Sequence, residues 1–256
     1  MTRLRATTRR AFLRSAGFVG ASLLAGCDAL SRTGWFPRVL GSAEHLNSGV
    51  QRVVAPTASM AQEFTEADLS PDFRSNGTSN PNNPEYQALR AENFGRWRLV
   101  VDGLVASPAS FSLTDLRAMR ARTQITRHDC VEGWSAIGKW TGVPLTDVLD
   151  RVRPTEAARY VVFHCADPMN ASGTHYYESI DLTEARHPQT ILAYELNGAP
   201  LPVKNGAPLR VRIERQLGYK MAKYLMRLEI VADLASIGKG RGGYWEDRGY
   251  AWYAGI

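Results

Sequence analysis

Short apolar runs with strand periodicity recur along this chain and limit the folds that it can adopt. Turn signals separate them, and the clearest helical pattern between them places its apolar residues on one face of Leu145–Val152. Asn197-Gly198 lies between two such runs and suits a type I′ hairpin turn. The other runs that predict strands are Arg96–Gly103, Thr123–Asp129, Arg159–His164, Pro208–Glu214 and Tyr224–Ala232.

Helical signals are fewer. Ser112 stands three residues before Asp115, a near capping box that opens a short helix. Strands and helices do not alternate regularly, and no Gly-rich turn of a dinucleotide fold follows a strand. With 44% apolar and 22% charged residues the composition is that of a globular protein. The sequence therefore predicts a mixed α+β fold, richer in strand than in helix.

The first 26 residues have the pattern of an export signal, with a charged start, an apolar middle and small residues at the end. Arg9-Arg10 resembles a twin-arginine signal, and the apolar stretch Ala16–Gly26 is too short to span a bilayer, which takes about 20 residues. Leu24–Cys27 resembles a lipoprotein box, which predicts acylation of Cys27 and a lipid-anchored protein on the periplasmic face of the cytoplasmic membrane. An ordinary cleavage site beside a chance cysteine is the alternative.

Cleavage of this signal changes the charge argument. Residues 1–26 carry five arginines and no acids, so their removal would lower the net charge from +6 to +1. Nucleic-acid binding therefore loses its main support. Twin-arginine passengers cross the membrane folded, often with a cofactor inside, which favours a redox or metal enzyme. Residues 27–73 are predicted to form a linker, and residues 74–256 one domain that opens with the loop Ser75–Tyr86.

Cys130 is predicted to lie where a strand runs into a loop, a usual location for chemistry. Three interpretations are open from the residues alone: a small buried hydrophobe, a disulfide with Cys165, or a metal-bound thiolate. No second thiol is near in sequence, and the five histidines form no H-x-x-x-H pair. A metal would therefore take Cys130 as its single protein ligand and an organic cofactor for the rest.

Two segments carry a family resemblance. "CVEGWSAIGKWTGVPL", from Cys130 to Leu145, resembles the cysteine segment of the sulfite oxidase family of molybdopterin-dependent oxidoreductases, above all in periplasmic methionine sulfoxide reductase catalytic subunits. "NGAPLRVRIERQLGYKMAK", Asn205–Lys223, is similar to the family's second cofactor segment. The resemblance implies a strand-rich sulfite-oxidase-type domain, a Mo-molybdopterin cofactor, and two-electron oxygen-atom transfer that reduces an S-oxide or N-oxide.

The resemblance also implies roles for single residues. Cys130 would be the catalytic residue and the molybdenum ligand. Cys165 stands where the reductases have a threonine, so its contact with the cofactor departs from the family pattern. Ser75 stands where sulfite-oxidising members carry an arginine, so efficient sulfite oxidation is not expected. The residues assigned to cofactor binding are Asn76, Ser79, Asn80, Cys165, Asn205, Arg210, Met221, Ala222 and Lys223.

The basic run within the second segment suits an anionic cofactor on chemical grounds. Arginine binds phosphate through a planar fork and lysine as a point charge, while Gly206 and Gly218 let the backbone approach closely. A solvated strand face is the alternative for this run. His128 is either a satisfied strand histidine or a proton relay. The basic residues are Arg210, Arg212, Arg215, Lys220 and Lys223.

The C-terminal segment is dense in aromatic residues, which are predicted to clamp the terminus onto the domain. No C-x-x-C-H haem motif occurs, so the resemblance implies electron exchange with a membrane haem subunit. Longer sulfite oxidases continue into a dimerisation domain, and a monomer is therefore expected. The competing hypothesis is a non-enzymatic lipoprotein that binds a small ligand or a partner and keeps Cys130 inert.

Overall fold

The computed structural model describes residues 33–36, 39, 42, 49–50 and 58–256. The predicted export signal and Cys27 lie outside the described residues. The chain divides into two compact units, Met1–Val54 and Ala55–Ile256. In the first unit Val39 N donates to Trp35 O at 3.0 Å, as in a helical turn. Within the described part, no helix combines the length and the hydropathy that a bilayer span requires.

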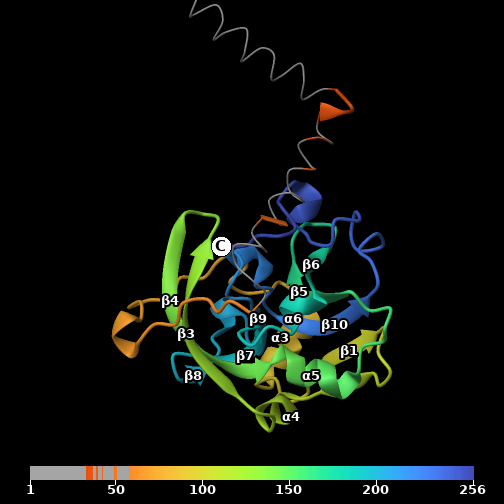
Figure 1. The fold of residues 1–256 in the computed structure, drawn as a ribbon. Coiled ribbons are helices and arrows are strands. Elements are labelled where there is room, and N and C mark those ends of the chain that lie inside the picture. Colours follow the sequence, from red (N-terminus) through yellow and green to blue (C-terminus); the bar gives the residue numbers. More distant parts are fainter. Residues whose placement is uncertain (1–32, 37–38, 40–41, 43–48, 51–57) are drawn as a thin grey trace, which may run out of the picture. The chain divides into compact units, whose positions relative to one another are not determined.

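The second unit contains a five-stranded sheet in the order β2-β1-β10-β5-β6 (Figure 1). Its neighbours are antiparallel, except that β1 runs parallel to β10, which lies far away in sequence. The strands are β1 (Leu99–Gly103), β2 (Ala109–Phe111), β5 (Tyr160–Pro168), β6 (His175–Asp181) and β10 (Leu225–Val231).

Another five-stranded sheet has the order β3-β4-β7-β8, with β9 paired to β7. Its longest part is the β3–β4 hairpin, which pairs in unbroken register from Arg122 opposite Gly142 to Cys130 opposite Trp134. Cys130 is therefore the last residue of β3, as predicted. The strands are β3 (Arg122–Cys130), β4 (Trp134–Pro144), β7 (Ile191–Leu196), β8 (Ala199–Pro200) and β9 (Arg210–Arg212).

The helices are short and connect the strands. In α4 the predicted capping box is confirmed, because Ser112 and Asp115 bond reciprocally across the first turn. α5 buries the predicted apolar face. The helices are α3 (Pro84–Ala91), α4 (Leu113–Arg117), α5 (Leu145–Val152) and α6 (Leu182–Ala185), and the 3-10 helices are η1 (Glu66–Asp68), η2 (Val203–Asn205), η3 (Gly218–Lys220) and η4 (Glu246–Arg248).

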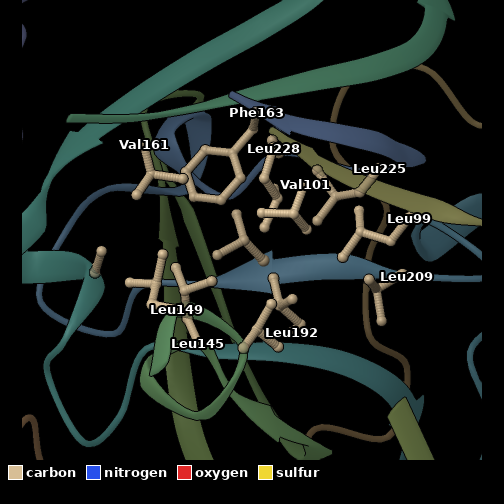
Figure 2. Packing of buried hydrophobic residues seen from close by; sticks show 14 of the residues in the cluster. Leu99, Val101, Leu145, Leu149, Val161, Phe163, Leu192, Leu209, Leu225 and Leu228 are labelled. Carbon is tan, nitrogen blue, oxygen red and sulfur yellow. The ribbon is translucent and has the colours of Figure 1, made fainter. Parts of the chain in front are cut away.

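The main core lies between the inner faces of the two sheets and α5. Figure 2 shows Phe163 of β5 and Leu228 of β10 on one side, with Leu145 and Leu149 of α5 and Leu192 of β7 on the other. All five are fully buried or nearly so. Each such side chain stabilises the fold by roughly 1.5–3 kcal/mol through the hydrophobic effect. Strand β3 ends at Cys130, and the turn that follows it carries part of the candidate site.

The strand-rich α+β fold class is confirmed. The hairpin prediction is confirmed as well, because Asn197 and Gly198 have φ values of 54° and 78°, as a type I′ turn requires. Within the predicted linker, Phe64 N donates to Ile125 O at 2.8 Å and Ser70 N to Ile137 O at 3.0 Å. This part of the predicted linker thus bonds to the β3–β4 hairpin, while the boundaries of the signal and linker stay predictions.

Candidate functional site

A pocket opens where the turn after β3 meets the loop that contains Asn76 and the segment from Gly218 to Lys223. Its empty space is about 740 Å³, including the part open to solvent. Five of the predicted site residues line this pocket although they come from three distant segments. They are Asn76, Cys130, Met221, Ala222 and Lys223.

Cys130 contributes the thiol of this pocket. The turn that follows it is closed by Gly133 N, which donates to Cys130 O at 3.0 Å and has a φ of 83°. Cys130 and Cys165 are both free thiols, so the disulfide alternative is wrong. Burial is the main cause that raises the pKa of Cys130, and a bound metal ion would deprotonate such a thiol. Among the described residues no group of three His, Cys, Asp or Glu side chains could hold a metal, and the role of Cys130 as a single metal ligand stays a prediction.

Lys223 forms the cationic end of the pocket. Its Nζ donates to Asn76 O at 2.6 Å and to Thr78 O, so it fixes the backbone of the loop that contains Asn76. The side chain is 6% exposed. Burial, and then the positive charge of Arg210, lowers the pKa of Lys223 to about 7.

Arg210 is fully buried behind this end. Its guanidinium donates to Asn205 O at 3.0 Å and to Met221 O at 3.1 Å, and it lies 5.1 Å from the ring centre of Trp140. Its Nε has no partner within the described part of the chain. Burial, and then the charge of Arg212, lowers the pKa of Arg210 to about 9.

The other three basic residues of the run have carboxylate partners. Arg212 pairs with Glu214 at 2.6 Å, and Arg215 pairs with Glu184 at 2.7 Å. Lys220 pairs with two glutamates, Glu178 and Glu246. These side chains are buried, so a solvated strand face is wrong for the run. Among the described residues, only Arg210 and Lys223 of the run lack an ion pair.

His128 is fully buried and makes a defined contact. Its Nδ1 lies 2.9 Å from Arg212, which can only donate, so Nδ1 accepts and the proton sits on Nε2. Burial, and then Arg212, lowers the pKa of His128 well below its usual value, which keeps the ring neutral. Gly218 allows this arrangement, since a Cβ there would lie 2.4 Å from His128 Nε2. Gly218 was predicted to let the backbone approach a ligand closely, and in the structure the group close to its backbone is the imidazole of His128.

The remaining predicted residues lie outside the pocket lining. Ser79 and Asn80 are exposed, and Asn80 accepts hydrogen bonds from Gln87 and Arg90 at 3.0 and 3.1 Å. Asn205 is buried and offers its carbonyl to Arg210. Cys165 is 3% exposed in the main core, and burial raises the pKa of its thiol well above the usual value. Their assignment to cofactor binding stays a prediction.

The sequence did not point to several lining residues. Glu132 and the aromatic residues Tyr176, Tyr219, Trp245 and Tyr250 all line the pocket. Part of the C-terminal segment does clamp the chain, as predicted, because Trp252 Nε1 donates to Ser179 at 2.9 Å. Neither local pattern nor charge marks Trp245 and Tyr250, since only the path of the chain brings them to the pocket.

The chain matches a family model described as an oxidoreductase molybdopterin binding domain over residues 86–236. It is 39% identical over 250 residues to a putative protein-methionine-sulfoxide reductase subunit YedZ1 of Azospira oryzae, covering 96% of this chain and 87% of that protein. This protein belongs to the molybdopterin-binding oxidoreductase family. It is a molybdenum oxidoreductase of the sulfite oxidase type, with Mo-molybdopterin as its cofactor.

Two further similarities are more partial. A protein-methionine-sulfoxide reductase catalytic subunit MsrP of Xanthomonas campestris pv. campestris is 40% identical over 154 residues. That match covers 57% of this chain, which spans about half (48%) of the Xanthomonas protein. The sulfane dehydrogenase SoxCD of Paracoccus pantotrophus has 21% identity and a TM-score of 0.48, over 54% of this chain and 38% of that chain. The SoxCD likeness is too weak to carry an argument.

The residues of the pocket fit this cofactor. Its phosphate is anionic, and Lys223 and Arg210 are buried cations without an ion pair in the described part of the chain. Asn76 Oδ1 and Arg210 Nε are also buried without a partner there, which leaves hydrogen-bonding capacity for a polar ligand. A thiol of the kind that molybdenum takes as a ligand lies in the same pocket. The family match also argues against the hypothesis of an inert Cys130 in a non-enzymatic lipoprotein.

Proposed function

We propose that this protein reduces a neutral S-oxide to the corresponding thioether, with Cys130 as the molybdenum ligand. The observation that carries the proposal is the pocket itself, in which the thiol of Cys130 and the buried cation Lys223 converge, with Arg210 buried behind Lys223. The cofactor would supply the two-electron redox chemistry. The reaction consumes two electrons and two protons and releases one water for each S-oxide reduced.

Three side chains would hold the cofactor. Lys223 Nζ and, behind it, Arg210 provide positive charge for the phosphate, and Asn76 offers an amide without a partner at Oδ1. Charge-assisted hydrogen bonds to phosphate are roughly twice as strong as neutral ones. Lys223 has a second task, because its bonds to Asn76 O and Thr78 O keep the loop in contact with the pocket.

The charge at the pocket favours a neutral substrate. Ser75, in the place of the arginine of sulfite-oxidising members, donates to Lys204 O at 2.5 Å and brings no charge. The two arginines nearest in sequence to the loop and to Cys130 are engaged elsewhere: Arg74 lies over Trp134, and Arg127 pairs with Asp129. Neither lines the pocket, and no lining residue in the described part of the chain is an arginine, so the planar fork of donors that suits a sulfite dianion is missing there.

Steady-state kinetics on the molybdenum-loaded protein test the proposal. Methionine sulfoxide with a reduced dye should be turned over, while sulfite with an artificial electron acceptor should stay below the ordinary enzyme range of kcat/KM, about 10⁴–10⁸ M⁻¹s⁻¹. Trimethylamine N-oxide, assayed in parallel, separates S-oxide from N-oxide reduction. A kcat/KM for sulfite inside that range would overturn the proposal, as would reduction of the N-oxide alone.

We further propose export by the twin-arginine route, acylation at Cys27, a monomeric enzyme and electron supply by a membrane haem subunit. Support comes from Arg9-Arg10, from the lipoprotein box, and from the name of the Azospira relative, a reductase subunit. Lysines at both arginine positions should leave the precursor in the cytoplasm, and Cys27→Ser should release the protein from membranes on fractionation. A Cys27→Ser protein that sediments with membranes as the wild type does would contradict the lipid anchor. Light scattering measures the mass in solution.

A further inference from the structure

The C-terminal segment contributes an aromatic surface to the candidate site. Trp245 and Tyr250 are stacked at 5.4 Å between ring centres, and Tyr250 meets Tyr219 edge to face at 5.1 Å. All three residues line the pocket. We call them the aromatic wall. They touch one another, whereas Asn76, Thr78 and Lys223 are joined by their own hydrogen bonds, so the pocket has an aromatic part and a cationic part.

Buried charges fix the aromatic wall in place. Lys220, next to Tyr219, donates from Nζ to Glu246 at 2.7 Å, and Glu246 is next to Trp245. Both ionic groups are at most 1% exposed. Tyr219 also donates from its hydroxyl to Ala251 O at 2.6 Å, beside Tyr250. The wall is therefore held at two points, and its rings are pre-organised rather than ordered by a ligand.

The wall remains accessible at the mouth of the pocket. Tyr250 is 37% exposed, and Val131, another lining residue in the turn after Cys130, is 44% exposed. Met169 adds a further apolar side chain to the lining. Among the described lining residues Glu132 and Asp167 are acidic, and the one cation, Lys223, is bonded to the loop in the cationic part of the pocket, so the surface around Tyr250 and Val131 is mainly apolar.

We propose that the aromatic wall of Tyr219, Trp245 and Tyr250 binds the organic substituent of the substrate and selects neutral S-oxides that carry a bulky apolar or aromatic group over small ones. This inference rests on the proposed S-oxide reduction. Aromatic rings attract both other rings and polarizable sulfur groups. A substituent that reaches Tyr250 gains about three- to tenfold in affinity, and one that is too short gains nothing.

The selectivity test compares methyl p-tolyl sulfoxide with dimethyl sulfoxide on the molybdenum-loaded protein. In the wild type, kcat/KM should be about three- to tenfold higher for the aryl compound. Tyr250→Ala should remove most of this preference through the KM of the aryl compound, while Tyr250→Phe, which keeps the ring, should retain it. Tyr253→Ala is the matched control, since Tyr253 lies in the same segment but does not line the pocket. If Tyr250→Ala lowers kcat/KM equally for both sulfoxides, or leaves the ratio of the two kcat/KM values unchanged, the proposed selectivity of the aromatic wall is wrong.

A binding measurement separates failure of the wall from failure of the proposed function. Methyl p-tolyl sulfoxide is titrated into the loaded protein while tryptophan fluorescence is followed, with Trp245→Phe to identify the responding residue. We expect Tyr250→Ala to bind about tenfold more weakly than the wild type. If neither sulfoxide is reduced but this difference is found, the proposed function fails and the wall stands. If the wild type binds no aryl sulfoxide, or Tyr250→Ala binds it equally well, the aromatic wall does not bind the substituent, and this holds whichever substrate the enzyme reduces.

Discussion

Lys223→Met should weaken retention of the cofactor by about tenfold to a hundredfold. Methionine fills the space of the lysine stem, so the change removes mainly the charge of a side chain that is 6% exposed and lines the pocket. A hydrogen bond to a charged group contributes about 1.5–3 kcal/mol, and about 1.4 kcal/mol corresponds to a factor of ten. The carbonyls of Asn76 and Thr78 lose their donor at the same time, which should also loosen the loop.

The pH dependence gives this prediction a second signature. Burial and the charge of Arg210 lower the pKa of Lys223 to about 7, against the opposite effects of Asp167 and Cys165. Below this pKa the ammonium is charged and available to an anion, and above it the charge is lost. Cofactor uptake by the cofactor-free wild type should therefore fall between about pH 6 and pH 9. A phosphate monoester is largely a dianion above about pH 6, so its own titration does not explain a fall.

Stability of the cofactor-free protein should move in the opposite direction. The folded-state pKa of Lys223 lies below the ordinary lysine pKa of 10.5, so the unfolded state binds more protons between about pH 7 and that value. The contribution of Lys223 to the free energy of unfolding is then least favourable at and below pH 7 and improves as the pH rises toward 10.5. Lys223→Met should remove this pH-dependent contribution to the free energy of unfolding.

Molybdenum content and released pterin fluorescence, measured after dialysis and after reloading at each pH, check the prediction. Lys204→Met is the matched control, because Lys204 is exposed and pairs with Asp72 at 3.3 Å. Retention in Lys223→Met equal to that in Lys204→Met, or a pH profile of uptake in Lys223→Met that follows the wild type, would refute the assignment of Lys223 to the cofactor phosphate.

Three other substitutions test separate parts of the structure. Cys130→Ser should lose molybdenum by metal analysis while the free energy of unfolding of the cofactor-free protein changes by less than about 1 kcal/mol; a variant that keeps its metal would remove Cys130 as the ligand. Arg210→Ala should lower that free energy by about 3 kcal/mol in urea, since it empties a fully buried site and leaves two carbonyls without a donor; an unchanged midpoint would contradict this. Glu246→Gln should lower it by about 2 kcal/mol, because Lys220 keeps a single carboxylate in a buried site, and Glu92→Gln at an exposed pair serves as the control.

Much of the fold could be predicted from local signals. Ser112 with Asp115, Asn197 with Gly198, and the apolar face of Leu145–Val152 each act within a few residues, and each appears in the structure as expected. Strand order could not be predicted in this way. The parallel pairing of β1 with β10 joins segments more than a hundred residues apart, and no local pattern encodes which strands become neighbours.

The candidate site shows the same division. The segment around Cys130 marks the thiol, because strand end, turn and cysteine are contiguous in sequence. The aromatic wall was missed, because Trp245 and Tyr250 reach the pocket only through long-range bonds such as Tyr244 N to Tyr177 O at 3.0 Å. Cys165 illustrates the reverse case, since a residue with reactive chemistry lies in the main core with a thiol pKa raised by burial.

The basic run explains why charge counting in a sequence is a weak guide to a ligand. All five of its basic residues are buried, and three meet glutamates supplied by other elements or by the run itself. An isolated buried charge is costly, so a fold retains one where something else compensates it. Arg210 and Lys223 are the two members without an ion pair among the described residues, and they adjoin a pocket that also presents Cys130. The uncompensated charge, rather than the total charge, therefore indicates where an anionic cofactor would stabilise the protein.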